Sequence, residues 1–135
     1  MRVRAALRVA SGIAVLVAAC NTPTIPLPPP RPEAEDVVVA RYAADPTKLV
    51  FSAEPAAPGD HLSFPPRALV SIYNDDVDVG VLAPTDGEGR FETEPITGEE
   101  GDRVRIWYVD EDGELSVDLC LLVALGRQTR GDVCP

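Results

Sequence analysis

The amino-acid sequence predicts an all-β fold, a single β-sandwich of about seven short strands. The clearest indication is residues 103–109, where apolar residues at positions 104, 106 and 108 alternate with Arg103, Arg105 and Trp107. Alternation with a period of two residues is typical of a strand with one face in a core. Turns rich in glycine, proline and aspartate separate the other short apolar runs. No stretch keeps a 3.6-residue apolar period between helix caps, so the pattern favours strands over helices.

Seven segments have the composition and spacing of strands. In the second of them, Leu49, Phe51 and Ala53 share one face, which we expect to be buried. The last segment is apolar throughout and ends at a glycine, which predicts a fully buried final strand. Leu115 and Val117 continue its alternation towards the N-terminus, so we expect them to be buried as well. The expected strands are residues 37–42, 48–53, 68–73, 79–82, 90–93, 103–109 and 119–125.

The N-terminus has the features of a secretory signal. Arg2, Arg4 and Arg8 precede a mainly apolar run at 9–19, which ends in small residues directly before Cys20. This run is shorter than the roughly 20 residues that a membrane-spanning helix needs. We therefore expect residues 1–19 to be a signal peptide and not a permanent span.

The order Val17-Ala18-Ala19-Cys20 resembles the lipobox of bacterial lipoproteins. The resemblance implies that the Cys20 thiol is linked to diacylglycerol and that the new amine receives a fatty acid such as palmitate. Two or more acyl chains hold a protein durably on a bilayer, so the implied partner is the membrane. By the same resemblance, Asn21 favours the outer membrane of the cell envelope. The alternative is an ordinary secreted protein with a cysteine after the cleavage site.

Charge and length restrict the classes of function. Removal of residues 1–19 would leave 135 − 19 = 116 residues, enough for one domain with a modest core. All 22 acidic residues would stay while the basic residues fall from 12 to 9, which gives a net charge of 9 − 22 = −13. An acidic surface of this kind argues against binding to nucleic acid or to anionic lipid. Mutual repulsion also favours a monomer.

Residues 20–35 are predicted to be a lipidated, proline-rich linker. Prolines occur at positions 23, 26, 28, 29, 30 and 32, with few residues that can pack. Such a chain takes an extended polyproline conformation and acts as a semi-rigid spacer. The folded domain is therefore expected to cover residues 36–135.

The other two cysteines, Cys120 and Cys134, form an even pair in a protein expected outside the cytosol. We expect a disulfide between them, which would close a loop of about 15 residues and contribute about 3 kcal/mol in the chain-entropy model. Two buried reduced thiols are the alternative. A metal site is less favoured because no histidine lies near either cysteine.

Three segments resemble motifs of bacterial Ig-like domains. Residues 86–91 (DGEGRF) resemble the aDGsF turn of that family, residues 101–106 (GDRVRI) its GDtVtV strand, and residues 109–116 (VDEDGELS) its tDaaGnvS hairpin. The resemblance covers roughly residues 47–118. It implies an Ig-like sandwich that serves as a spacer, adhesin or presentation scaffold. A regulatory-type sandwich, of the kind found beside carboxypeptidases, is the alternative fold.

Residues that could support catalysis are few. His61 is the sole histidine and lies in a proline-broken loop with Asp60 and Ser63, where no nucleophile elbow positions a serine. The sequence lacks zinc-ligand spacing, and no glycine loop accompanies Lys48, the sole lysine. We therefore expect a protein that is not an enzyme and has no cofactor.

Calcium is the one chemical alternative. Asp110, Asp112 and Glu114 alternate within one predicted turn, and a second acidic run lies at 74–78. Carboxylates on neighbouring loops can coordinate Ca²⁺. The alternative function is therefore a calcium-dependent module that binds a ligand such as a polysaccharide. Neither run matches a full EF-hand loop, and ordinary acidic turns would have the same composition.

Trp107 shares with Arg103 and Arg105 the strand face that points away from the core. Tryptophan and arginine are enriched at binding hot spots, so the three residues predict a patch for an envelope protein or a polysaccharide. The alternative is a tryptophan that is covered by stacked arginine. The main functional prediction is a non-catalytic envelope lipoprotein whose Ig-like domain serves surface interaction, adhesion or envelope organisation.

Overall fold

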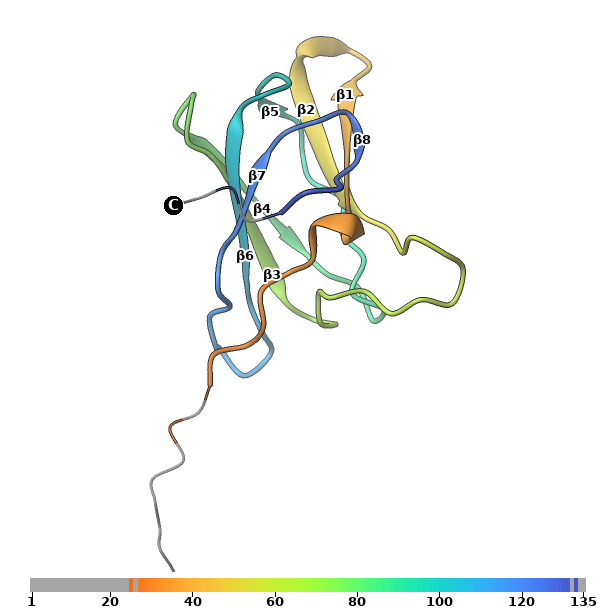
Figure 1. Ribbon diagram of the computed structural model, residues 1–135, viewed down its shortest axis with the longest axis vertical. Helices are drawn as coiled ribbons and strands as arrows, with labels where there is room; N and C mark the ends of the chain where they lie inside the picture. Colours follow the sequence, from red (N-terminus) through yellow and green to blue (C-terminus); the bar gives the residue numbers. More distant parts are fainter. Residues whose placement is uncertain (1–24, 26, 132, 134–135) are drawn as a thin grey trace, which may run out of the picture.

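A computed structural model describes residues 25, 27–131 and 133 of the chain. The described chain forms two four-stranded antiparallel sheets that pack face to face (Figure 1), preceded by a 3-10 turn, η1 (Ala34–Asp36). The predicted all-β sandwich is therefore confirmed. Among the described residues, no helix has the length and apolar character needed to cross a membrane.

The first sheet consists of four strands, β1 (Val37–Tyr42), β2 (Asp45–Ala53), β5 (Ile96–Thr97) and β8 (Gly126–Arg127). Their order across the sheet is β5-β2-β1-β8. β1 and β2 form a hairpin in which Val37 lies opposite Ala53, and a bulge interrupts the register at Arg41 and Tyr42. The two short strands pair with the outer sides of this hairpin.

The second sheet consists of β3 (Leu69–Asn74), β4 (Val79–Pro84), β6 (Arg103–Val109) and β7 (Leu119–Leu122). Their order is β4-β3-β6-β7, and every neighbouring pair is antiparallel. β1, β2, β5 and β8 thus share one sheet, while β3, β4, β6 and β7 share the other. Apart from β8, which pairs with the outer side of β1, this partition resembles that of an immunoglobulin-type sandwich.

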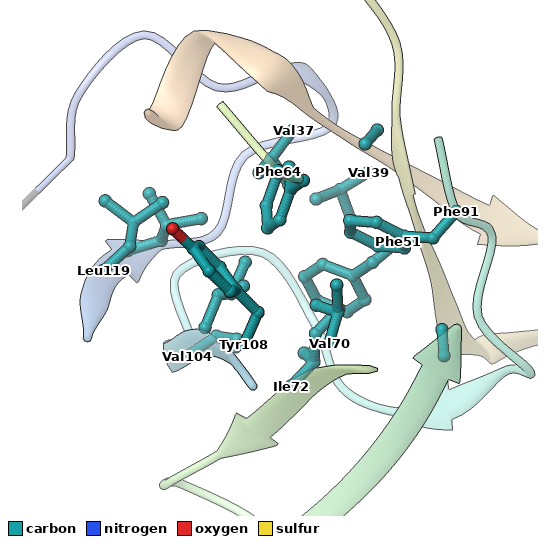
Figure 2. Packing of buried hydrophobic residues seen from close by; sticks show 14 of the residues in the cluster. Val37, Val39, Phe51, Phe64, Val70, Ile72, Phe91, Val104, Tyr108 and Leu119 are labelled. Carbon is teal, nitrogen blue, oxygen red and sulfur yellow. The ribbon is translucent and has the colours of Figure 1, made fainter. Parts of the chain in front are cut away.

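The core lies between the sheets, and every second residue of the longer strands points into it. Leu49, Phe51 and Ala53 are buried as predicted, and so are Val104 and Ile106. Each large apolar side chain that is fully buried contributes about 1.5–3 kcal/mol to stability. Figure 2 shows how the side chains of the two sheets meet. The labelled core residues are Val37, Val39, Phe51, Phe64, Val70, Ile72, Phe91, Val104, Tyr108 and Leu119.

Three aromatic rings fill one end of the core. Phe64, from the loop before β3, contacts Phe91 edge-on with 4.9 Å between ring centroids and lies 6.2 Å from the Tyr108 ring. Edge-on pairs add about 0.5–1.5 kcal/mol beyond the area that they bury. Only Arg90 separates Phe91 from the turn at 86–89, so this turn places an aromatic ring into the end of the sandwich.

Several strand boundaries differ from the prediction. Residues 90–93 form only a bridge, between Glu92 and Ser52, although Thr93 and Phe51 exchange hydrogen bonds beside it. β5 and β8 were not predicted because two residues are too short to show a period. The final predicted strand ends at Leu122 and not at residue 125. The chain then turns to the first sheet, and the buried Gln128 side chain bonds three backbone groups of that turn.

Leu115 and Val117 are not buried, so that prediction was wrong. They are 55% and 42% exposed, whereas Ser116 between them is buried. The Ser116 hydroxyl oxygen accepts the N–H of Tyr108 at 2.9 Å, and the Tyr108 carbonyl accepts the N–H of Ser116. These bonds turn the serine inward, and the apolar alternation begins only at Leu119.

The N-terminal segment joins the domain earlier than predicted. The Tyr108 hydroxyl donates to the carbonyl of Pro30 at 2.8 Å, and Glu33 N–H donates to the hydroxyl of Ser63 at 2.8 Å. Ala34 is part of the core. The packed domain therefore begins near Pro30, inside the expected linker 20–35. The predicted signal peptide 1–19 and Cys20 lie outside the described residues.

A buried polar cluster ties the two sheets together at the opposite end. The Asn74 amide donates to Asp102 Oδ2 at 2.8 Å and to the Thr97 carbonyl at 3.4 Å, and Asn74 Oδ1 accepts the Asp76 N–H. Asp102 Oδ2 also accepts the N–H of Glu99. Because Asn74 ends β3 and Thr97 ends β5, this one amide connects both sheets.

We predict that Asn74→Ala lowers the free energy of unfolding by about 2 kcal/mol, because Asp102 loses its buried amide donor. Urea denaturation followed by circular dichroism would measure the change. Asp112→Ala, at an exposed turn position, is the control and should change stability by less than about 0.5 kcal/mol. Equal stability of Asn74→Ala and the native protein would contradict a role for this cluster.

The carboxylate of Asp86 stabilises the turn at 86–89 by accepting backbone hydrogen bonds. Asp86 Oδ1 accepts the backbone N–H groups of Arg90 at 2.9 Å and Glu88 at 2.8 Å, and these bonds lower the pKa of Asp86. Gly89 has a φ of 82° and sits directly against the Phe64 carbonyl, so a side chain there would clash. The turn needs glycine for geometric reasons and aspartate for electrostatic ones.

We predict that Asp86→Asn makes the melting temperature less dependent on acidic pH. A carboxyl whose folded pKa is lowered stabilises the fold above its unfolded pKa of about 3.9, and this stabilisation is lost as the pH falls through the folded pKa. The variant should melt below the native protein at pH 7, and the gap should close towards pH 2.5. Glu94→Gln, at an exposed site, is the control. A gap that does not change with pH would contradict the prediction.

Candidate interaction surface

The predicted patch lies on the outer face of the second sheet. β6 points Val104, Ile106 and Tyr108 inward, so its alternate residues Arg105 and Trp107 point outward. In the register with β3, Trp107 lies opposite Ser71 and Arg105 lies opposite Tyr73. The prediction placed the tryptophan and arginine on one face, and the structure adds Tyr73 from the neighbouring strand.

The guanidinium of Arg105 lies over two aromatic rings. Its guanidinium carbon lies 5.3 Å from the centroid of Tyr73 and 5.8 Å from that of Trp107. The same guanidinium binds Asp75, with Nε 3.1 and 3.0 Å from the two carboxylate oxygens and Nη2 2.9 Å from Oδ1. Asp118 lies 3.8 Å from Nη1. The hydrogen bonds to Asp75 raise the pKa of Arg105 above its usual value, so the cation is permanent.

A glycine on β4 makes room for this arrangement. Gly80 lies opposite Tyr73, and a Cβ at that position would be 3.1 Å from Tyr73 Cδ2. The tyrosine ring therefore lies close over the β4 backbone. Sequence reasoning missed Tyr73 and Asp75, which are 32 and 30 residues from Arg105. The strong alternation of residues 68–73 was a signal for the face of Tyr73, but no sequence signal set the register between the strands.

Arg103 is not part of the stack. It is exposed, and its backbone N–H donates to Asp76 Oδ2 at 2.7 Å. Of the three residues in the predicted patch, Arg105 and Trp107 therefore form a stacked pair, and Arg103 lies apart from it. Arg105 stacks on Trp107, as the second interpretation predicted, and the ring stays partly exposed. The binding role of Trp107 stays a prediction.

Apolar side chains surround the stacked Arg105 and Trp107. Leu69 and Leu82 are 41% and 60% exposed, and the register places Leu82 opposite Ser71, which in turn lies opposite Trp107. Leu69 lies between Pro84 and Val109, and Val109 bridges to Leu115. We call this surface the outer-face patch. It consists of Leu69, Tyr73, Leu82, Pro84, Arg105, Trp107, Val109 and Leu115.

Ion pairs lie at both ends of the outer-face patch. Arg105 pairs with Asp75, and Arg67 at the other end lies 3.4 Å from Glu111. The chain as a whole has 22 acidic and 12 basic residues. The outer-face patch thus combines exposed apolar area with arginines that are paired with carboxylates. Exposed apolar patches rimmed by polar residues mark interaction sites in soluble domains.

The predicted calcium ligands lie in the β6–β7 connection. Asp110 Oδ1 accepts the N–H groups of Asp112 at 3.0 Å and Glu114 at 2.8 Å, so this carboxylate stabilises its own turn. In the part of the chain that the structure describes, no three acidic, histidine or cysteine side chains form a group that could hold a metal ion. The acidic turn therefore has a structural explanation in Asp110.

A groove of about 730 Å³ opens beside this turn, where the N-terminal segment packs. His61 and Glu114 line the groove together with the buried Phe64 and Tyr108. Burial, with the negative charge of Asp110, raises the pKa of the Tyr108 hydroxyl. Ser63 beside His61 is engaged elsewhere, since its N–H donates to Asp36 and its hydroxyl accepts from Glu33. The serine thus holds the N-terminal segment in place.

Cys120 lies on the outer face of β7 and is nevertheless buried. Its carbonyl accepts the N–H of Val133 at 3.2 Å, so the C-terminal segment runs beside β7. Cys134, the predicted partner of Cys120, lies outside the described residues. The disulfide between the two stays a prediction, and the neighbouring Val133 contact is compatible with it.

No protein-family model, curated protein or solved structure gives a significant match to this chain. The lipoprotein and Ig-like families that the sequence motifs imply therefore stay predictions. The strand order and the outer-face patch are observed in the structure, and the proposed contact role rests on them.

We predict that Arg105→Ala exposes Trp107, the sole tryptophan. Loss of the stacked guanidinium should move the fluorescence maximum to longer wavelength and increase quenching by acrylamide. Because the arginine is more than one-third exposed, the loss of stability should be only about 0.5–1 kcal/mol. Arg103→Ala, on the same strand, is the matched control and should leave the fluorescence unchanged. The same fluorescence shift in both variants would contradict specific stacking of Arg105 on Trp107.

Proposed function

We propose that this protein is a non-catalytic lipoprotein of the bacterial cell envelope that presents an Ig-like sandwich for contact with another envelope or surface component. The observation that carries the contact role is the outer-face patch, in which a fixed tryptophan and arginine lie among exposed leucines. Rigid aromatic and arginine side chains supply contact area at low entropic cost. A surface of this kind suits recognition of a partner more than chemistry.

The proposed anchor is Cys20, supported by the basic start, the short apolar run and the lipobox-like order before it. The N-terminal segment meets the sandwich at the end where the chain turns between β6 and β7 (Figure 1), and Pro30 is bound there by Tyr108. The 30 − 20 = 10 residues from Cys20 to Pro30 would span about 31 Å when extended at about 3.1 Å per residue.

This attachment would orient the domain. The end with residues 110–114 would face the bilayer, and the strands would run away from it. The outer-face patch would then face sideways, perpendicular to the bilayer normal, and would be accessible to neighbouring molecules. The acidic composition would keep the domain off an anionic lipid surface, so the lipid alone would provide attachment.

We predict that Cys20→Ser abolishes lipid attachment. The full chain would be produced in a bacterium that is fed an alkyne-tagged palmitate. The native protein should incorporate the label and sediment with membranes, while Cys20→Ser should do neither, because one thiol provides the diacylglycerol linkage.

Cys134→Ser is the control for the label, since it removes a different cysteine and should leave labelling intact. Mass spectrometry of the N-terminal peptide would identify the modified residue. Native protein that is unlabelled and found in the soluble fraction would refute the anchored part of the proposal.

A further inference from the structure

The two sheets have four edge strands, and three of them are short or covered. β5 and β8 contain two residues each. β7 has four, and the Cys120 carbonyl on this strand is bonded by Val133. β4 is different, because it has six residues, none of them charged, in the sequence VGVLAP. Natural sheets normally protect such an edge with charge, proline, a bulge or a covering segment, and β4 has only Pro84, at its last position.

The backbone of β4 has hydrogen-bonding groups that point away from the sheet. Thr85 N–H donates to the Ala68 carbonyl at 2.9 Å. Since bonding alternates along an antiparallel pair, Ala83, Val81 and Val79 also bond to β3, and Gly80 and Leu82 direct their N–H and C=O groups outward. Within the described residues, no backbone bond from outside the β3–β4 pair reaches Gly80 or Leu82.

Both faces of this edge are apolar. Val79 and Val81 point inward and are only partly buried against the core, because the opposite sheet ends there in the short β5. Leu82 points outward and is 60% exposed. A strand added beside β4 would cover the two valines with one set of side chains and Leu82 with the alternate set. Extended peptides bind exposed sheet edges in this way.

We propose that the β4 edge binds an extended segment of a partner protein, with alternating apolar residues and positively charged ends. Charge selects this partner over a second copy of the chain. Asp76 and Asp78 precede β4, and Asp86 follows it, whereas the next acidic residue, Glu88, is paired with Arg90. Antiparallel pairing of two β4 strands would bring the acidic start of one towards the acidic end of the other. A partner strand with Lys or Arg at its ends would meet opposite charges.

This inference rests on the proposed contact role and is independent of the lipid. It names the partner as a polypeptide strand and places its backbone beside Gly80 and Leu82. The labelling of Cys20 and the binding test below can therefore fail separately.

The test uses the full chain in detergent and a capped peptide, Arg-Val-Thr-Val-Thr-Val-Lys. Hydrogen exchange measured by NMR should show new protection at the Gly80 and Leu82 amides when the peptide is added. The same peptide with a methyl group on every backbone nitrogen should not bind, because neither of its edges can then donate a hydrogen bond to β4. A peptide with glutamate at both ends should bind about threefold or more weakly.

Leu82→Lys should weaken peptide binding about tenfold, because it places a charge where the partner side chain packs. Leu122→Lys is the matched control, since Leu122 is also an outward leucine on an edge strand and is 52% exposed. It should leave binding within about twofold. Circular dichroism would confirm that both variants fold.

Three results would overturn the proposal. The first is unchanged binding by Leu82→Lys, or an equal loss in Leu122→Lys. The second is binding of the N-methylated peptide. The third is protection of Gly80 and Leu82 that rises with protein concentration in the absence of peptide, which would make a second copy the occupant.

Discussion

β6 determines both the interior and the exposed surface of this protein. It lies in the middle of its sheet, paired with β3 on one side and β7 on the other. Because side chains alternate along a strand, burial of Val104, Ile106 and Tyr108 forces Arg105 and Trp107 outward. A shift of one residue would place a guanidinium in the core, which is strongly unfavourable unless the charge is paired there. The register that builds the core therefore also builds the outer-face patch.

Polar groups are used mainly to fix the ends of this sandwich. At one end, Asn74 and Asp102 link the sheets through a buried amide and carboxylate. At the other, Tyr108 holds Pro30 with its hydroxyl, and its N–H is satisfied by Ser116. No buried side-chain nitrogen or oxygen among the described residues lacks a hydrogen-bond partner. Complete pairing of this kind specifies one arrangement of loops around an apolar core.

The outer surface carries two features that a purely structural sandwich would not need. One is Arg105, which forms an ion pair with Asp75. The flat guanidinium of this residue also covers two aromatic rings. The other is the uncharged β4, which keeps an open edge where the remaining edges are short or covered. The two are adjacent, since Gly80 of β4 lies under the ring of Tyr73. A partner strand on β4 would thus extend the sheet that carries the patch.

The amino-acid sequence by itself determined the fold class, most strand positions and the outward face of Trp107, because alternation and turn residues act over only a few neighbours. It placed residues 103–109 in a strand with both boundaries as found. It could not show that Ser116 would take the inward position in place of Leu115, since that follows from a bond to Tyr108. Tertiary structure alone decided three features. These are the contacts of Arg105 with Tyr73 and Asp75, the crossing of the chain to β8, and the uncovered edge of β4. Each depends on which strands become neighbours, and that pairing is set by packing between residues far apart in the chain.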